Sequence, residues 1–353
     1  MPQRRPETVL GWDVGGAHLK VSCFDAAGAL RDVCQRPCAL WRGVEHLHRA
    51  IDEVLTRQCP RSPVAHAVTM TGEMADLFPT RKHGVRSLVD ALEQHLGARR
   101  VDFYAADGGW LRGAAVRARP QLAASNNWHA SARALAARMD HALLVDMGST
   151  TVDIVPVAAG RVLAQGHCDS DRLALGELVY TGAVRTPLMA LGESAPVGGR
   201  HIALMAELFA TTADVYRVLG WLPDGADQHD TADGAAKTAP ASAQRLARMV
   251  GCDAGDHAPE TWEALAAWFA DVQLGRIEAA ARRVLERSGL PAHAPVVAAG
   301  VGAFVVERLA HRLGRQVWPY CTALGLQAQP ALAWADRCAP AVAVGLLYLG
   351  RQT

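Results

Sequence analysis

Residues 11–20 read Gly11-Trp12-Asp13-Val14-Gly15-Gly16-Ala17-His18-Leu19-Lys20 and directly follow the apolar pair Val9-Leu10. The pattern predicts a buried strand that ends in an aspartate, then a tight glycine turn into a second strand. Glycine has no Cβ, so backbone N–H groups in such a turn can approach an anion closely. An aspartate beside the turn can hold Mg²⁺, which prefers oxygen ligands and keeps several waters. We therefore predict that Asp13 binds Mg²⁺ and that phosphate oxygens contact Gly15, Gly16 and Ala17.

A similar stretch lies later in the chain. It reads Asp146-Met147-Gly148-Ser149-Thr150-Thr151-Val152-Asp153 and follows the apolar run Ala142-Leu143-Leu144-Val145. Two such hairpins that face each other would clamp a metal-bound polyphosphate. This stretch supplies Asp146 and Asp153 as predicted metal ligands, and a purely structural role is an equal alternative for Asp153. The predicted phosphate contacts here are Gly148, Ser149, Thr150 and Thr151.

A third glycine stretch reads Val296-Val297-Ala298-Ala299-Gly300-Val301-Gly302-Ala303-Phe304. It again predicts a strand, a glycine turn and a helix, and it adds Gly300 and Gly302 to the expected diphosphate-binding or nucleotide-binding residues. A single Asp-x-Gly occurs in many ordinary turns, so the prediction rests on all three stretches in this order.

Hydrophobic periodicity predicts the other elements. The first half is expected to form three strands within residues 8–38, a helix at 43–57, and then strand 64–70, helix 84–96, strand 101–104 and helix 126–139. The second half is expected to form three strands within 142–165, helices at 202–219, 241–250 and 261–288, and a strand at 295–299. The order predicts an α/β protein with mixed sheets flanked by helices. Residues 222–240, with Asp230-Thr231-Ala232-Asp233-Gly234, are expected to form a solvated loop, and capping of a ligand is the alternative.

The three glycine stretches resemble the phosphate-1, phosphate-2 and adenosine motifs of the actin, sugar-kinase and Hsp70 superfamily. The run Ala339–Leu347 resembles the small-residue helix with which these chains return to their first domain. The resemblance implies two actin-like (ribonuclease H-like) domains with a central cleft. The first would span residues 1–140 and 337–353, and the second residues 141–336. Lys20 then takes the place of a lysine that contacts phosphate.

Kinases of this superfamily usually carry a carboxylate on the helix before phosphate-2. Here that helix opens with Ser125-Asn126-Asn127-Trp128-His129, and an amide cannot accept a proton at neutral pH. Ordinary phosphoryl transfer or ATP hydrolysis is therefore disfavoured. Glu73 is a candidate base, with a helix-capping role as an equal alternative, and His129 is a second candidate base. The predicted catalytic residues are Lys20, Glu73, Asn126, Asn127 and Arg185, the last for bidentate contact with an anion.

Further segments resemble the hydantoinase/oxoprolinase-related branch: Thr71–Asp76, Ser125–Trp128 and Asp230–Gly234. Within it, the chain is similar to proteins of tetrahydromethanopterin-linked one-carbon metabolism and to archaeal members of the methanofuran pathway. The resemblance implies an Mg²⁺-dependent transferase. It would join an aminomethylfuran methyl diphosphate to a phenolic amine derived from tyramine or tyrosine, and release pyrophosphate. ATP binding is possible in this family but is not required by the reaction.

Two other functions remain open. The first is a small-molecule kinase or ATPase that uses the same clamp on ATP, for which a carboxylate before phosphate-2 would be the distinguishing feature. The second is a nucleotide-binding scaffold without catalysis, which would not need to keep Lys20, Arg185 and polar residues at its strand ends.

Composition restricts the partners and the compartment. The 353 residues carry a formal net charge of +1 without a basic run, so nucleic acid and anionic membranes are not expected as partners. No stretch is long and apolar enough for a predicted membrane span. Eight cysteines without a CxxC pair predict reduced thiols in the cytoplasm. We expect a monomer or a homodimer with small-molecule substrates.

Overall fold

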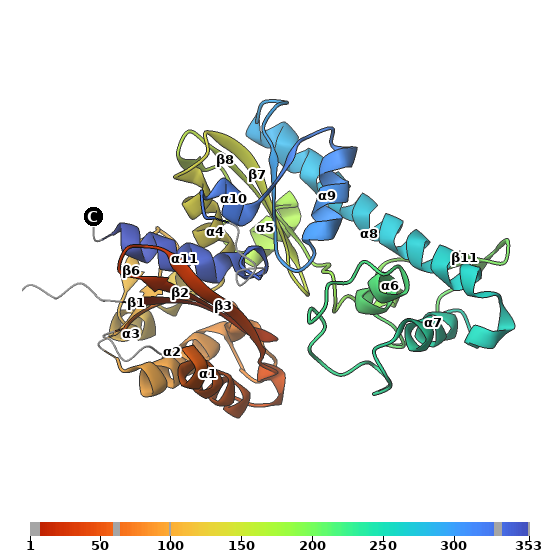
Figure 1. Ribbon diagram of the computed structural model, residues 1–353, viewed down its shortest axis with the longest axis horizontal. Coiled ribbons are helices and arrows are strands. Elements are labelled where there is room, and N and C mark those ends of the chain that lie inside the picture. Colours follow the sequence, from red (N-terminus) through yellow and green to blue (C-terminus); the bar gives the residue numbers. More distant parts are fainter. Residues whose placement is uncertain (1–7, 59–63, 99, 328–333, 352–353) are drawn as a thin grey trace, which may run out of the picture. The chain divides into compact units, whose positions relative to one another are not determined.

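A computed structural model of the chain describes residues 8–58, 64–98, 100–327 and 334–351 (Figure 1). The chain divides into two compact units. Unit 1 comprises Met1–Ala142, Val155–Leu163 and Trp318–Thr353, and unit 2 comprises Leu143–Ile154 and Ala164–Val317. The described residues form two mixed sheets and a separate two-stranded hairpin.

The sheet of unit 1 has the strand order β3-β2-β1-β4-β5-β6. Antiparallel pairing joins β1 to β2 and β2 to β3, whereas β4 lies parallel to β1 and β5 lies parallel to β4. Its strands are β1 (Thr8–Val14), β2 (His18–Asp25), β3 (Leu30–Pro37), β4 (Val64–Met70), β5 (Val101–Tyr104) and β6 (Trp110–Leu111). Its helices are α1 (Glu45–Gln58), α2 (Arg81–Leu96), α3 (Gly113–Ala118), α4 (Asn127–Ala136), α10 (Tyr320–Ala323) and α11 (Ala339–Gly350).

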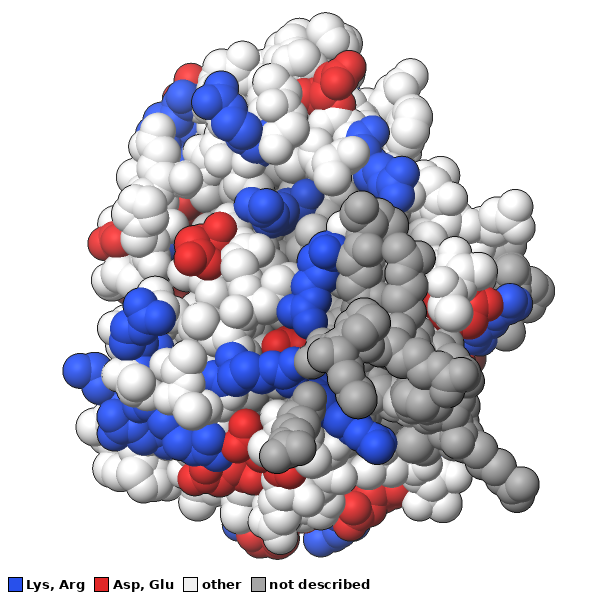
Figure 2. Space-filling model, turned by 90° about the vertical axis from the view of Figure 1, so that its left-hand side faces the viewer, with Lys and Arg blue, Asp and Glu red and all other residues white. Residues whose placement is uncertain are grey.

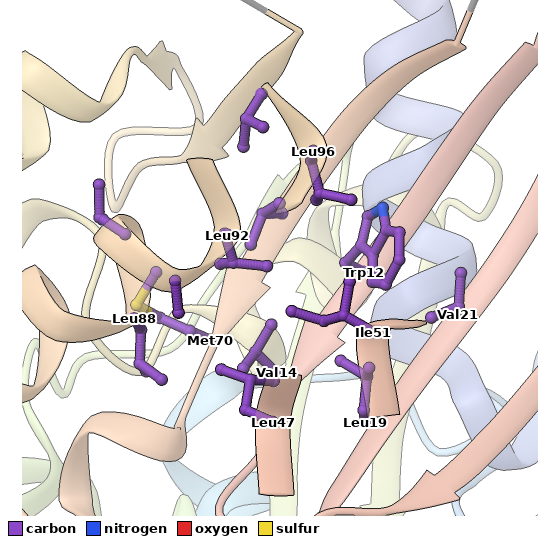
Figure 3. Close-up of a cluster of buried hydrophobic side chains, with 14 of the residues drawn as sticks. Trp12, Val14, Leu19, Val21, Leu47, Ile51, Met70, Leu88, Leu92 and Leu96 are labelled. Carbon is purple, nitrogen blue, oxygen red and sulfur yellow. The ribbon is translucent and has the colours of Figure 1, made fainter. Parts of the chain in front are cut away.

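One face of this sheet forms the apolar core of unit 1 (Figure 3). Trp12 and Val14 of β1 lie among leucine and isoleucine side chains of α1 and α2, including Leu47, Ile51 and Leu92. Because successive strand residues point to opposite faces, Gly11 and Asp13 lie on the other face.

Helix α11 covers that other face at very short range. A Cβ on Gly11 would lie 2.2 Å from the carbonyl oxygen of Ala341, and a Cβ on Gly345 would lie 2.5 Å from the ring of Phe24. The Ser22 hydroxyl donates to the same Ala341 carbonyl at 2.8 Å. The small residues of α11 and the glycine of β1 therefore allow the helix to return onto the first strands of the chain.

The second sheet has the strand order β10-β8-β7-β13-β14, with β9 paired to β8. Parallel pairing of β13 with β7 places Ala299 opposite Asp146. Its strands are β7 (His141–Met147), β8 (Val152–Ala158), β9 (Arg161–Val162), β10 (Leu178–Val179), β13 (Val296–Ala299) and β14 (Val317–Pro319). The accompanying elements are α5 (Asp169–Leu175), α6 (Thr212–Val218), α7 (Ala239–Arg248), α8 (Pro259–Ser288), α9 (Ala303–Arg312) and the hairpin of β11 (Ser194–Val197) and β12 (Arg200–Ala203).

The α/β class and the element order of the first half are confirmed. The helix predicted for residues 202–219 is wrong over its first part. Gly198 and Gly199 adopt positive φ angles of 56° and 79°, which suit a tight hairpin turn, so residues 200–203 pair with β11. Helix α6 begins only at Thr212, where Thr211 and Asp214 form a capping box. The domain limits and the central cleft stay predictions.

The surface carries side chains of both charges. On the face drawn in Figure 2, Lys and Arg side chains lie among Asp and Glu. Of the helices that the structure describes, none has the length and apolarity to cross a membrane.

Candidate active site

The first glycine turn joins β1 to β2 in unit 1. Asp13 lies opposite Lys20 of β2 and opposite Thr69 of β4, so three polar residues form a row across neighbouring strands. The Lys20 ammonium is 3.4 Å from a carboxylate oxygen of Asp13, and both side chains are largely buried. The Gly15 N–H donates to the carbonyl of His18 at 3.0 Å and closes the turn. The structure thus brings together a carboxylate and an ammonium where the sequence predicts metal and phosphate binding.

The two central glycines of this turn differ in their surroundings. A Cβ on Gly15 would lie 2.9 Å from the carbonyl oxygen of His18, so packing alone requires glycine there. A Cβ on Gly16 would meet no heavy atom of the described residues within 4 Å, and its φ is not positive. Folding therefore does not demand glycine at position 16. The open space beside its backbone fits a bound anion.

A short 3-10 helix, η2 (Gly72–Met74), lies against this turn and carries Glu73. The Thr71 N–H donates to the carbonyl of Val14 at 2.9 Å. Glu73 is only 1% exposed, and burial raises the pKa of its carboxyl group against the lowering effects of Ser125 and Arg81. Its Oε1 accepts a 2.7 Å hydrogen bond from the Ser125 hydroxyl, whereas Oε2 has no hydrogen-bond partner among the described residues.

The alternative that Glu73 caps a helix is not supported, because Thr80 provides the side-chain cap of α2. Asn126 and Asn127 stand at the start of α4, as predicted. The Asn126 amide donates to the carbonyl of Leu122 at 2.6 Å, and the Asn127 side chain accepts from the N–H of Trp128 at 2.8 Å. Both amides therefore stabilise the start of α4, and a catalytic role for them stays a prediction.

The second candidate base, His129, also has a local partner. Its Nδ1 lies 3.0 Å from the hydroxyl of Tyr104, and burial raises the pKa of that phenol. Tyr104 therefore stays protonated and is suited to donate to the imidazole, which leaves Glu73 as the stronger candidate for the base.

The second glycine turn joins β7 to β8 in unit 2. The Gly148 N–H donates to the carbonyl of Thr151 at 2.9 Å. Residues 181–186 lie directly on this turn: Ala183 N–H donates to the Gly148 carbonyl at 3.0 Å and Arg185 N–H to the Ser149 carbonyl at 2.8 Å. A Cβ on Gly148 would approach only the Thr151 carbonyl oxygen, at 3.6 Å. The space beside Gly148 therefore resembles that beside Gly16.

Arg185 is held at this turn by its backbone N–H, and its side chain also contacts the turn. Its guanidinium is exposed and lies 3.5 Å from the Thr150 hydroxyl. The position suits contact with an anion at the turn, as the sequence predicts.

The third glycine stretch supports the strand end that carries Asp146. Gly300 has a φ of 84°, and a Cβ there would lie 2.2 Å from the carbonyl oxygen of Met147 and 2.5 Å from a carboxylate oxygen of Asp146. The Gly302 N–H donates to the Met147 carbonyl at 2.8 Å, and a Cβ on Gly302 would lie 2.4 Å from the Met147 side chain. Both glycines are thus required by close packing, whether or not they also contact a ligand.

Gln273, which the sequence did not single out, holds residues 181–186 in place together with Thr212. Gln273, in the middle of α8, donates to the Thr181 hydroxyl at 2.6 Å and to the Gly182 carbonyl at 2.8 Å. The Thr212 hydroxyl donates to the same Gly182 carbonyl. A glutamine within a long amphipathic helix gives no signal in the sequence that it contacts a distant turn.

Asp153 has a buried structural partner. Its carboxylate lies 2.8 Å from the guanidinium of Arg172, which is 1% exposed. This 2.8 Å hydrogen bond between buried side chains gives Asp153 a structural role that does not depend on a cation. The ion pair thus favours the structural alternative, and metal binding by Asp153 stays a prediction.

A magnesium ion fits what each of the two turns offers by itself. Nowhere in the described ranges do three or more His, Cys, Asp or Glu side chains gather as a metal-binding cluster. Mg²⁺ commonly takes only one or two carboxylates and completes its shell with water and substrate phosphates. Asp13 and Asp146, each near the end of its strand and each beside a glycine turn, suit that mode of binding.

Comparison with known proteins supplies the family. The sequence family described as Hydantoinase/oxoprolinase matches residues 65–338, which is most of the chain. The chain belongs to the hydantoinase/oxoprolinase family. A curated relative from Methanocaldococcus jannaschii is 32% identical over 246 residues, which cover 69% of this chain and 72% of the relative. It is named (4-{4-[2-(gamma-L-glutamylamino)ethyl]phenoxymethyl}furan-2-yl)methanamine synthase.

A protein from Methanococcus vannielii carries the same name and is 29% identical over 165 residues, covering 47% of this chain and 72% of that protein. Among solved structures, a nucleotide-free acetone carboxylase superimposes with a TM-score of 0.57 at 14% identity, covering 97% of this chain and 70% of that one. This similarity shows the shared fold. The resemblance to the family and to its methanofuran-pathway members is confirmed.

Proposed function

We propose that this protein is a transferase that joins the methyl carbon of an aminomethylfuran methyl diphosphate to the oxygen of a phenol. The relative at 32% identity carries this proposal, because the product in its name contains a phenoxymethyl group on a furan. That group is an aryl ether, and the enzyme must form its O–CH₂ bond. The cofactor made in this way would be a methanofuran-type carrier for one-carbon metabolism.

The reaction balances with residues of the two turns. The phenol oxygen forms a bond to the CH₂ carbon, the bond from that carbon to the diphosphate oxygen breaks, and pyrophosphate leaves with the electron pair. Asp13 and Asp146 are each suited to hold Mg²⁺, which would supply positive charge to the diphosphate. Lys20, Arg185 and the backbone N–H groups beside Gly16 and Gly148 stabilise the charge that develops on the leaving group.

The phenol proton needs an acceptor, and Glu73 suits this role. Its carboxyl group is buried, and its raised pKa strengthens it as a base compared with an exposed glutamate. The cation-like furfuryl carbon would be stabilised by the furan itself and by an aromatic neighbour. Trp128, next to Asn127 at the start of α4, is the candidate for that neighbour.

The experiment that tests this function compares two reactions with one protein. In the first, the protein is incubated with Mg²⁺, a furfuryl diphosphate and a tyramine derivative, and in the second with Mg²⁺, ATP and an alcohol acceptor. We expect pyrophosphate and an aryl ether only in the first reaction. Release of ADP in the second would instead favour a small-molecule kinase or ATPase, and product in neither would favour a nucleotide-binding scaffold.

We further propose that the protein acts in the cytoplasm as a monomer or homodimer. Four of the seven cysteines within the described residues are buried as small core side chains, which suits a reducing compartment. Light scattering coupled to size-exclusion chromatography gives the oligomeric state directly.

A further inference from the structure

Ser125, just before α4, has an unusual backbone conformation. Its φ is +50°, and within the described ranges only Ala159 shares a positive φ among residues other than glycine. Such a conformation is strained and persists where the surrounding structure fixes it. Strain of this kind often accompanies functional sites, so the contacts of Ser125 deserve a functional explanation.

Those contacts form a closed triangle with Glu73 and Arg81. The Ser125 hydroxyl donates to Glu73 Oε1 at 2.7 Å and accepts from the guanidinium of Arg81, also at 2.7 Å. The same Arg81 nitrogen lies 3.4 Å from Glu73 Oε1. A hydroxyl has only one proton to donate. Because Arg81 can only donate to the Ser125 oxygen, the Ser125 proton points to Oε1 of Glu73.

The backbone of Glu73 is fixed from the other side. Gly84 of α2 packs so closely that a Cβ there would lie 2.6 Å from the carbonyl oxygen of Glu73 and 2.8 Å from its Cα. Arg81 lies less than one turn earlier on the same helix. Helix α2 therefore holds both the main chain and one carboxylate oxygen of Glu73.

The other carboxylate oxygen is left for a ligand. Oε2 is buried and has no hydrogen-bond partner among the described residues. A buried acceptor without a partner is destabilising, so a native structure seldom keeps one without a role.

We propose that Ser125 and Arg81 are positioning residues that occupy Oε1 of Glu73 and so reserve Oε2 for the proton of the acceptor phenol. This inference rests on the proposed function. In the reaction, the phenol O–H proton passes to Oε2 while the phenol oxygen bonds to the furfuryl carbon and pyrophosphate leaves. Glu73 is then the catalytic base, and Ser125 and Arg81 act only through it.

The groups around Glu73 determine whether its pKa should rise or fall when Ser125 or Arg81 is removed. Arg81 from α2 and the Ser125 hydroxyl both lower the pKa of the carboxyl group, against the larger raising effect of burial. Removing Ser125 or Arg81 therefore raises the pKa of Glu73, and the base is charged over a narrower range of pH.

The experiment uses Ser125→Ala and Ser125→Gly together. Both remove the hydroxyl, but glycine adopts a φ of +50° without strain, so a shared effect comes from the lost hydrogen bond. Arg81→Met tests the second positioning residue. The controls are Ser131→Ala on α4, whose hydroxyl donates to the Asn127 carbonyl, and Arg86→Met on the exposed side of α2, whose side chain donates to the Arg117 carbonyl.

Two readouts are combined. The pKa of Glu73 is followed by carbon-13 NMR of labelled glutamate, with Glu73→Gln to assign the signal, and turnover is followed across pH. For both Ser125 variants and Arg81→Met we expect a higher pKa of Glu73, an acidic limb of kcat that moves to higher pH, and kcat reduced about 10-fold at neutral pH with little change in KM. Glu73→Gln should lose about 10²-fold or more. The controls should match the wild type in both readouts.

An unchanged pKa of Glu73 in the Ser125 and Arg81 variants would overturn the positioning role. An unmoved acidic limb in these variants would overturn it as well. If the wild type forms no ether at all, the proposed function fails, and the NMR titration still decides the positioning role because it needs no substrate.

Discussion

At the scale of one residue, a substitution at Gly16 can test anion binding without disturbing the fold. Its missing Cβ faces open space within the first turn, so alanine should fit without strain. We expect Gly16→Ala to keep the melting temperature of the wild type within about 2 °C, because surface substitutions usually change stability by less than about 0.5 kcal/mol. Turnover should nevertheless fall by about 10²-fold, because a methyl group would push the diphosphate away from the backbone N–H groups.

Gly275→Ala is the matched control for this prediction. Gly275 lies within α8, and a Cβ there would also meet nothing within 4 Å among the described residues. Turnover should be unchanged, and stability should rise by about 0.5 to 1 kcal/mol, because alanine favours helix over glycine. Normal turnover in Gly16→Ala would show that no anion approaches the first turn.

His66 makes the stability of unit 1 dependent on pH. Its side chain is buried, its Nδ1 accepts from the Trp12 indole at 3.1 Å, and burial lowers its pKa from 6.5 to about 4. Because the pKa is lower in the folded state, the unfolded state binds a proton first as pH falls. The folded state therefore has its full stability above about pH 6.5, where His66 is neutral in both states. It loses stability progressively as the pH falls to about 4.

We expect the free energy of unfolding to fall by about 2 kcal/mol between pH 7 and pH 5 through this residue. Urea unfolding at both pH values measures the loss. His66→Gln, which keeps an acceptor for Trp12 without titrating, should flatten the profile over this interval. An equally steep profile in the variant would place the dependence on other groups.

At the scale of elements, Gly182 links residues 181–186 to the second turn. A Cβ on Gly182 would lie 2.4 Å from backbone atoms of Ser149 and Thr150. Backbone cannot move aside as a flexible side chain can, so Gly182→Ala should cost about 1 to 3 kcal/mol of stability and displace the turn. Gly148→Ala, at a site where a Cβ fits, should lose turnover and keep its stability. Thermal melts and turnover of the two variants decide this, and equal melting temperatures would contradict it.

The sequence predicts the elements whose signal is local. The turns around Gly15 and Gly148 could be recognised because strand, aspartate and glycine follow one another directly. Residues 202–219 were mistaken for one helix because their apolar spacing outweighed the Gly198-Gly199 turn before them. The contacts that Ser125 makes with Glu73 and Arg81, and that Gln273 makes with Gly182, could not be predicted, because they join residues 44 to 91 positions apart. Their contribution exists only after the fold brings these segments together.

At the scale of the whole molecule, α11 makes unit 1 depend on a late part of the chain. Gly345 packs against the ring of Phe24, and a Cβ there would lie 2.5 Å from it. Gly345→Leu should therefore lift α11 from the sheet and destabilise unit 1 by about 3 kcal/mol. Hydrogen exchange followed by mass spectrometry should show faster exchange in β1 and β2. Unit 2, whose core lies elsewhere, should exchange as in the wild type, and uniform acceleration would contradict the prediction.

The late position of α11 in the chain also delays the completion of unit 1 during translation. When the ribosome has made the first segment of unit 1, which ends at Ala142, the helix that begins at Ala339 is still roughly 200 residues from being translated. At about 5 to 20 residues per second, this delay lasts on the order of 10 to 40 s. Throughout that time the nascent chain carries a sheet with one face uncovered, which invites chaperone binding. A truncated translation product without α11 would leave that face of the sheet exposed. We therefore expect proteases to cleave the truncated chain faster than the full-length chain.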